Sequence, residues 1–214
     1  LAPGSGATPA FLVRLDGRNG CVLSVTRILL AWSSGVSNTS APRMAVDSRG
    51  AVWLGGVAST PLPVTPDAAQ DSGTIRLSQN SNDQGTFPGS LIRFSPNGDS
   101  IEYATYLGDG EDAVSSIAID GNGNVYAVGS RIWKFASTGK LLWSTWIKPG
   151  AALVAAVDEG NDLYIGGCTT ALQPPLFTTP NAFQSSTTNT AVVRFEETQY
   201  FPKHCVDGFV ARFS

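Results

Sequence analysis

The sequence predicts an all-β fold, and three features of its composition carry this prediction. Its 214 residues include 23 glycines and 13 prolines, which favour turns over long regular elements. Charged residues that favour helices are scarce, with four Lys and five Glu against ten Arg and twelve Asp. At 42% hydrophobic residues, the chain still has enough apolar material for one sizeable core. We therefore expect short strands, many turns and almost no helix.

Charge and hydropathy argue against three classes of protein. A formal charge of −3 with 14% charged residues fits neither a strongly basic nucleic-acid binder nor a disordered polyelectrolyte. No run reaches the roughly 18 to 20 apolar residues of a membrane span, because even residues 21–32 are interrupted by Ser24, Thr26 and Arg27. The first residue is Leu1 rather than Met, so we expect that a preceding segment has been cleaved or truncated.

A sequence repeat organises the chain. Residues 45–56, 118–129 and 156–167 align without a gap. An aspartate leads, an aromatic residue follows six positions later, and a glycine closes at nine. The repeated positions are Asp47, Asp120 and Asp158, then Gly50 and Gly123 inside the turn, then Trp53, Tyr126 and Tyr164, and finally Gly56, Gly129 and Gly167. Each copy predicts two short strands joined by a tight turn.

Two further strands follow each hairpin. The third strand carries a cation flanked by apolar residues, at residues 11–15, 90–94, 131–135 and 209–213. A glycine turn then leads into a fourth strand, at residues 99–107 and 140–147. Four strands per repeat predict the blade of a β-propeller, so the fold class we expect is a propeller of four-stranded antiparallel blades.

A third element is inserted after the second strand of two repeats. Residues 61–70 and 175–184 share a Thr-Pro-(Asp/Asn)-Ala core, whereas Ser130 runs straight into Arg131 in the middle repeat. The proline near its start favours a short helical turn. We interpret the inserts as loops on a regular frame.

These motifs together resemble the bacterial SBBP repeat family, named for the seven-bladed β-propeller. The resemblance rests on the Val-Asp-x-x-Gly-x-Val-Tyr type of hairpin, the Thr-Thr-Pro-Asn-Ala-Phe-Gln segment, and the strands Tyr-Ala-Thr-Tyr-Leu-Gly and Asp-Gly-Phe-Val-Ala-Arg-Phe-Ser. It covers most of residues 9–214. The resemblance implies a propeller fold and a secreted or cell-surface bacterial protein, periplasmic location being an alternative, and implies little about biochemical activity.

The repeats divide the chain into unequal blades. Counted from the aspartate strand, residues 42–107 and 114–147 form complete blades, while residues 10–41 and 153–214 form partial ones. Propellers typically close with about 4 to 8 blades, so this chain does not close a seven-bladed ring alone. We expect an open arc or part of a larger propeller, completed by further sequence or by neighbouring subunits. Uncovered blade faces and an open strand edge favour such association.

The repeated acids are candidates for catalysis or calcium binding. Residues 120–124 alternate oxygen-bearing side chains with glycines, as a calcium loop does, but Arg131 stands where the closing Glu would be. A carboxylate that accepts backbone N–H bonds in a hairpin turn explains all three copies at once, so we predict a structural role. The repeated aromatics are predicted to pack between blades. Trp143 and Trp146 lie three apart in a strand and are expected on opposite faces.

Histidine and cysteine offer few catalytic options. His204 precedes Cys205, but adjacent residues of an extended segment point apart, which argues against a nucleophile and base pair. The spacing of Cys21, Cys168 and Cys205 matches no zinc pattern. Two alternatives stay open for them: buried thiols, or a disulfide between Cys168 and Cys205 in an oxidising compartment. We predict no metal and no cofactor.

The function expected from these features is that of a non-enzymatic, extracytoplasmic scaffold or binding module. The inserted loops, residues 57–87 and 168–206, are expected to meet protein or glycan partners, because loops on a rigid frame carry recognition. Nucleic acid and membrane insertion are not expected. The alternative is a fragment of a propeller enzyme, a quinone-dependent dehydrogenase or a hydrolase or lyase, with its catalytic residues mostly outside this chain.

Overall fold

The computed structural model describes residues 9–31, 42–76, 86–110, 112–147, 150–169, 178–183 and 207–214. None of these residues is helical, and the regular elements are thirteen β-strands, so the predicted all-β class is confirmed. No described helix is therefore long and apolar enough to cross a membrane. The strands are β1 (Pro9–Leu15), β2 (Val22–Ala31), β3 (Arg43–Val46), β4 (Val52–Val57), β5 (Gly89–Phe94), β6 (Ile101–Leu107), β7 (Ser116–Ile119), β8 (Val125–Val128), β9 (Arg131–Phe135), β10 (Leu141–Trp146), β11 (Gly150–Val157), β12 (Leu163–Thr169) and β13 (Asp207–Phe213).

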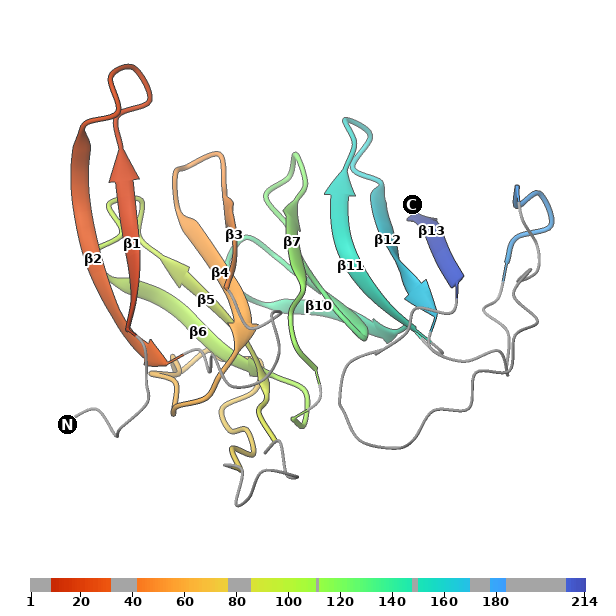
Figure 1. Cartoon of the computed structure of the whole chain (residues 1–214), viewed down its shortest axis with the longest axis horizontal. Coiled ribbons are helices and arrows are strands. Elements are labelled where there is room, and N and C mark those ends of the chain that lie inside the picture. Colours follow the sequence, from red (N-terminus) through yellow and green to blue (C-terminus); the bar gives the residue numbers. More distant parts are fainter. Residues whose placement is uncertain are drawn as a thin grey trace.

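The strands form four antiparallel sheets that stand side by side along the molecule (Figure 1). Two sheets have four strands in chain order, β3-β4-β5-β6 and β7-β8-β9-β10. The sheet before them holds β1 and β2, and the sheet after them holds β11, β12 and β13. Four-stranded antiparallel sheets stacked in this way are propeller blades. The last sheet begins at Gly150, three residues before the blade boundary expected at residue 153.

The hydrophobic core is divided into three clusters, one at each junction between neighbouring sheets. The first cluster joins Ile28 of β2 to Ile92 and Phe94 of β5. The second and third clusters lie on either side of the third sheet. Because successive residues of a strand point to opposite faces, Ile92 belongs to the first cluster and its neighbour Leu91 to the second. The two central blades therefore bury apolar residues on both faces.

The outward faces of the two terminal sheets are apolar and uncovered among the described residues. On the first sheet, Val13 lies opposite Val25, and both are exposed. On the last sheet, Val210 of β13 is 81% exposed and lies opposite Gly166 of β12. In the sequence repeat, Val13 aligns with Ile92, which is fully buried against the preceding sheet. The same kind of position is thus buried inside the arc and exposed at its ends.

The first insert lies along the outer edge of β6. The Thr65 N–H donates to the Ala104 carbonyl at 3.2 Å, and the Tyr106 N–H donates to the Gln70 carbonyl at 3.1 Å. The Tyr106 hydroxyl accepts the Leu62 N–H at 2.8 Å. The sequence predicts a short helical turn in the core of this insert. The structure has one turn there, closed by the Ala68 N–H, which donates to the Thr65 carbonyl at 3.0 Å. The insert therefore satisfies edge groups of the blade that carries it.

Candidate functional site

The three aspartate turns share one geometry. In each, one carboxylate oxygen accepts the backbone N–H groups two and four residues later, and the carbonyl accepts the N–H three residues later. The N–H pairs are Arg49 and Ala51 on Asp47, Asn122 and Asn124 on Asp120, and Gly160 and Asp162 on Asp158, all at 2.8–3.0 Å. The third residue after the aspartate has positive φ: Gly50 at 86°, Gly123 at 80° and Asn161 at 68°. Glycine and asparagine tolerate this conformation best.

The surroundings of the three carboxylates differ. Asp47 and Asp120 are buried, with 6% and 5% exposed, whereas Asp158 is exposed. A lysine of the third strand, Lys134, places its ammonium 3.8 Å from the Asp120 carboxylate. Hydrogen bonding from the Asp162 N–H is the largest influence on Asp158 and holds the pKa of its carboxyl below the usual value. Each acid therefore acts on groups of its own blade.

The repeated aromatic and the third-strand cation form a pair in every blade that contains both. The register places Trp53 opposite Arg93, Tyr126 opposite Lys134, and Tyr164 opposite Arg212. The distances from cation to ring centroid are 5.7, 4.8 and 5.8 Å respectively. Trp53 and Tyr126 are buried, and Tyr164 in the terminal sheet is only partly so. The sequence showed both members of each pair but not their contact, because strand register is a property of the folded sheet.

The two tryptophans of β10 occupy opposite faces of the third blade. Trp143 makes an edge contact with Tyr126 at 6.3 Å between ring centroids, and Trp146 lies over the guanidinium of Arg131 at 3.8 Å. Arg131 also lies 5.7 Å from the centroid of Trp133. Both β10 rings stay partly exposed, 38% for Trp143 and 47% for Trp146, since β10 is an edge strand without an insert. The third blade therefore exposes one aromatic ring on each of its two faces.

The closing glycines lie where another backbone segment approaches closely: Gly129 faces the segment that leads into β7, and Gly167 faces β11 of its own sheet. A Cβ added at Gly129 would stand 2.0 Å from the Ala113 carbonyl oxygen, and one added at Gly167 would stand 2.1 Å from that of Ala151. Gly56 belongs to β4 and lies opposite Ser90. No side chain other than hydrogen fits at Gly129 and Gly167 without moving the backbone.

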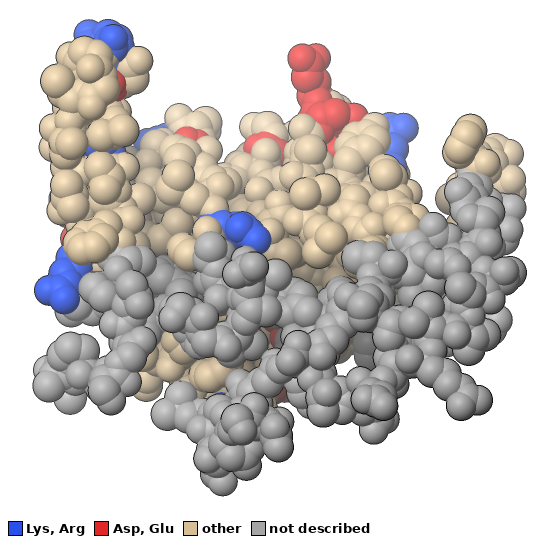
Figure 2. Space-filling model, viewed as in Figure 1, with Lys and Arg blue, Asp and Glu red and all other residues tan. Residues whose placement is uncertain are grey.

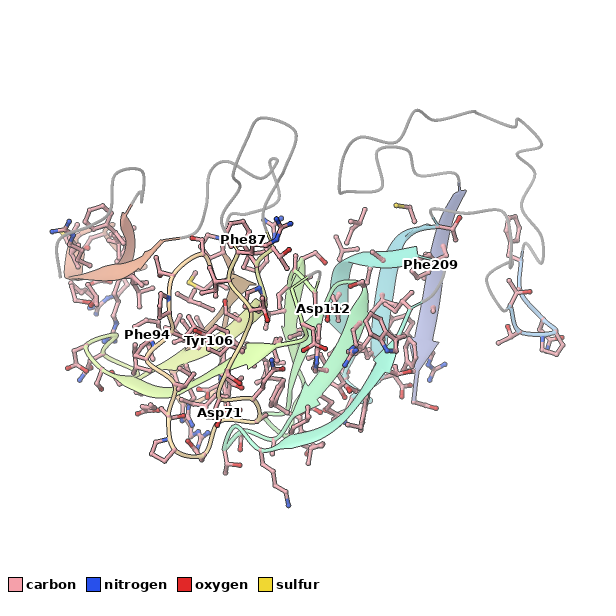
Figure 3. The ribbon with its side chains drawn as sticks, turned by 90° about the horizontal axis from the view of Figure 1, so that it is seen from below. Asp71, Phe87, Phe94, Tyr106, Asp112 and Phe209 are labelled. Carbon is pink, nitrogen blue, oxygen red and sulfur yellow. The ribbon has the colours of Figure 1, made fainter. Side chains whose placement is uncertain are left out.

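A buried acid that the sequence analysis did not single out lies between the second and third blades. Asp112 is buried in the segment between β6 and β7 and accepts the Ser130 hydroxyl at 3.1 Å (Figure 3). It carries no repeat signature that would have revealed it. Figure 2 shows acidic and basic side chains scattered over the described part of one face, the acidic ones mostly at the upper turns. Among the described residues, no three His, Cys, Asp or Glu side chains are grouped to hold a metal ion.

The cysteine and histidine predictions fall largely outside the described residues, where His204 and Cys205 lie. Cys168 is disulfide-bonded, and Cys21 is a free, exposed thiol. The pairing of Cys168 with Cys205 stays a prediction. Of the loops expected to meet partners, the structure describes residues 57–76, 86–87, 168–169 and 178–183, and the neighbouring position 207 pairs with Thr169.

Comparison with protein families identifies one repeat of the chain. Residues 102–130, from β6 through β8 to Ser130, match the SBBP family model, described as a beta-propeller repeat. Residues 102–130 are a β-propeller repeat. The resemblance expected from the sequence is thus confirmed over this segment. The rest of the arc consists of sheets of the same antiparallel type, so the propeller fold holds for the chain.

Other comparisons concern architecture alone. A luciferin-regenerating enzyme is similar at 18% identity and a TM-score of 0.30, with 78% of this chain and 68% of that chain covered. A gluconolactonase from Xanthomonas campestris is similar at 18% identity and a TM-score of 0.31, with 72% of this chain and 61% of that chain covered. Likeness at this level carries no argument for a shared activity. No curated protein sequence matches the chain.

Proposed function

We propose that the chain is a non-enzymatic β-propeller scaffold that presents its inserted loops to protein or glycan partners outside the cytoplasm. The observation that carries this proposal is that the repeated acids bind backbone groups of their own turns. Asp47, Asp120 and Asp158 each direct a carboxylate oxygen at two backbone N–H groups of their own turn. A general acid or nucleophile needs an oxygen directed at a substrate, whereas these serve three separate hairpins.

The first insert has the properties of a recognition loop held by a rigid frame. Its inner side is fixed by the hydroxyls of Tyr103 and Tyr106, which accept the N–H groups of Ala69 at 3.2 Å and Leu62 at 2.8 Å. Its outer side exposes Asp67 among prolines and small residues. A loop anchored in this way presents polar groups at little cost in conformational entropy on binding.

The setting outside the cytoplasm is supported by the disulfide bond of Cys168. Disulfides persist in oxidising compartments and are rare in the cytosol. The scarcity of lysine, four residues in the chain, is in keeping with this proposal. Secretion, cell-surface or periplasmic location is tested by fractionating the cells that naturally produce the protein and detecting it in each fraction.

Partner binding is tested on the exposed acids of the insert. The full chain is applied to a glycan array and to intact cell surfaces, and any binding is compared with that of a variant carrying Asp67→Asn and Asp71→Asn. Both side chains are exposed on the described insert. The control is Glu159→Gln, which changes another exposed acid, on the β11–β12 turn that Figure 1 places at the other end of the strands. We expect binding to weaken at least threefold in the insert variant and to stay unchanged in the control.

The non-enzymatic part of the proposal has its own test. The chain is assayed for hydrolase, lyase and quinone-dependent dehydrogenase turnover over broad substrate panels. Turnover that Asp120→Asn abolishes while the unfolding midpoint stays unchanged would overturn the scaffold proposal.

The binding experiment has its own contradicting outcome. Binding that is lost equally in the Glu159→Gln control would overturn the assignment of partner binding to the insert.

A further inference from the structure

The second carboxylate oxygen of Asp120, Oδ2, collects polar side chains from three parts of its blade. The side-chain amide of Asn124 donates to this oxygen at 2.8 Å, and the Tyr126 hydroxyl lies 3.5 Å from it. The ammonium of Lys134 stands 3.8 Å away. The turn, the second strand and the third strand of the third blade therefore meet at one buried carboxylate.

The second blade carries different residues at the three equivalent positions. Ala51 stands in place of Asn124, Trp53 in place of Tyr126, and Arg93 in place of Lys134. The methyl group of Ala51 offers no hydrogen bond, and an indole has no hydroxyl. The equivalent oxygen, Oδ2 of Asp47, is buried and accepts no hydrogen bond from the described residues. The Arg49 guanidinium, at 3.7 Å, lies outside hydrogen-bond range of this oxygen.

Two donors of the second blade lack an acceptor in the same way. Within the described part of the chain, neither Trp53 Nε1 nor Arg93 Nε has a hydrogen-bond partner, and both atoms are buried. The other nitrogens of Arg93 are engaged, Nη1 with the Ser137 carbonyl at 3.1 Å and Nη2 with Glu102 at 3.1 Å. Buried polar groups of folded proteins nearly always have a partner. One acceptor and two donors therefore need partners at this place.

The repeat brings these three groups together. The Asp47 and Asp120 turns have the same hydrogen bonds, and the aromatic–cation pairs of the two blades occupy the same register. In the third blade, both members of the pair face Oδ2 of Asp120. In the second blade, Arg93 lies 5.7 Å from the centroid of the Trp53 ring. We therefore expect Trp53 Nε1 and Arg93 Nε to face Oδ2 of Asp47.

We propose that one water molecule is bound inside the second blade between Asp47, Trp53 and Arg93. It accepts hydrogen bonds from Trp53 Nε1–H and Arg93 Nε–H and donates one to Oδ2 of Asp47, and about three hydrogen bonds are usual for a buried water. The water supplies what the Asn124 amide and the Tyr126 hydroxyl supply in the third blade. The inference is independent of the proposed function, because it concerns the interior of a blade and not its loops.

The groups around the site select a small neutral ligand. The Asp47 carboxylate repels an anion, and the two N–H groups offer no lone pair to a metal cation. The ligand must both donate and accept, as water does. Ala51 is smaller than Asn124 by one carboxamide group, so the residue that lacks the donor also leaves space for a small molecule. Leaving three buried groups unpaired costs more free energy than immobilising one water.

The water also has a consequence for the junction between blades. Arg93 binds the Ser137 carbonyl, which belongs to the β9–β10 turn of the third blade. A water that holds Nε of Arg93 restricts the rotation of the guanidinium and so keeps Nη1 directed at that carbonyl. The bound water therefore helps to hold the residue that joins the second blade to the third.

The water is detected on the full chain by NMR, with the tryptophan indoles labelled with ¹⁵N. In a rotating-frame experiment, dipolar cross-relaxation with water differs in sign from chemical exchange with water. We expect a dipolar peak between water and the Trp53 indole proton. A crystal structure of the full chain is the second measurement, and we expect one water within about 2.7–3.2 Å of Asp47 Oδ2, Trp53 Nε1 and Arg93 Nε.

A matched pair of variants tests whether the site depends on residue 51. Ala51→Asn supplies the amide that Asn124 supplies in the third blade, so we expect it to displace the water and abolish the peak. Ala69→Asn makes the same change at an exposed position of the first insert and should leave the peak unchanged. Because Ala51 is fully buried, the unfolding midpoint of Ala51→Asn is measured first. If this variant does not fold, the two measurements on the wild type decide.

Three results would each refute the inference. One is a wild-type chain whose Trp53 indole proton shows no dipolar peak with water. Another is a crystal structure in which Trp53 or Arg93 donates directly to Oδ2 of Asp47, or in which an ion lies between them. The third is a folded Ala51→Asn variant that keeps the peak as strong as it is in Ala69→Asn.

Discussion

The guanidinium of Arg93 lies 5.7 Å from the centroid of the Trp53 ring, and the two residues face each other across β4 and β5. Arg93 also donates to the Ser137 carbonyl at 3.1 Å and pairs with Glu102 at 3.1 Å. One cation thus joins two strands of its blade to the turn of the next. The recurrence of this pair in three sheets explains why each repeat keeps an aromatic residue in its second strand and a cation in its third.

Removing the charge of Arg93 should weaken the fold. We expect Arg93→Met to lower the free energy of unfolding by about 1–2 kcal/mol, because a partly buried cation–π contact and a hydrogen bond are lost while the aliphatic stem is kept. Arg14, the equivalent cation of β1, is exposed in a sheet of only two described strands. Arg14→Met should change the free energy by less than about 0.5 kcal/mol. Equal effects in chemical denaturation would contradict the pairing argument.

Asp120 tests the turn interpretation. Asp120→Ala leaves the N–H groups of Asn122 and Asn124 without their acceptor, so we expect a loss of about 1–3 kcal/mol in the free energy of unfolding. Asp120→Asn keeps an oxygen at the same place and should cost clearly less. Urea denaturation of the two variants provides the measurement. A variant pair with identical losses would mean that the charge, and not the hydrogen bonds, is what matters.

Gly129 tests the close approach between the end of β8 and the segment that leads into β7. In Gly129→Ala the added methyl group would stand 2.0 Å from the Ala113 carbonyl oxygen, so the backbone must shift. We expect destabilisation of about 1–3 kcal/mol, the usual cost of overpacking. The control is Gly17→Ala in the β1–β2 turn, where nothing lies within 4 Å of the new atom. Thermal unfolding that does not distinguish the two variants would refute the proposed role of the glycine.

The Asp158 turn should make stability depend on pH. Its pKa lies below the ordinary 3.8 in the folded chain, mainly through the Asp162 N–H. A carboxyl with a lowered folded-state pKa stabilises fully above its unfolded pKa and loses this contribution as pH falls through the folded value. The difference in Tm between the wild type and Asp158→Asn should therefore narrow below about pH 4. A difference that stays constant between pH 6 and pH 2.5 would contradict this assignment.

The thiols give a chemical test. We expect one reactive thiol in the denatured, unreduced chain, at Cys21, and three after reduction, because Cys168 is disulfide-bonded. Peptide mapping should place Cys168 and Cys205 in one cross-linked fragment. Cys168→Ser should lower the free energy of unfolding by about 2–4 kcal/mol, typical for removal of a disulfide. A cross-linked fragment that contains Cys21 would show the predicted pairing to be wrong.

Much of the fold could be predicted from local features of the sequence. The spacing from Asp120 to Tyr126 predicts a turn followed directly by a strand. The hydrogen bonds of this turn join residues that are close in the sequence, so both elements depend on only a few residues. Asp112 could not be found in this way, because its contact with Ser130 depends on how two connecting segments meet. The sequence also could not show that the first insert covers the edge of β6, since Thr65 and Ala104 lie far apart in the sequence.

The sequence by itself determined the strands, their turns and their grouping into blades, because hairpin geometry depends on a few neighbouring residues and alternation of side chains follows from the pleat. Tertiary structure decided which surfaces are buried and which edges are closed. Ile92 and Val13 occupy the same repeat position, yet one is fully buried and the other exposed. The physical reason is that burial depends on the packing of two sheets, and closure of an edge depends on the pairing of two strands. Neither can therefore be a property of a single repeat.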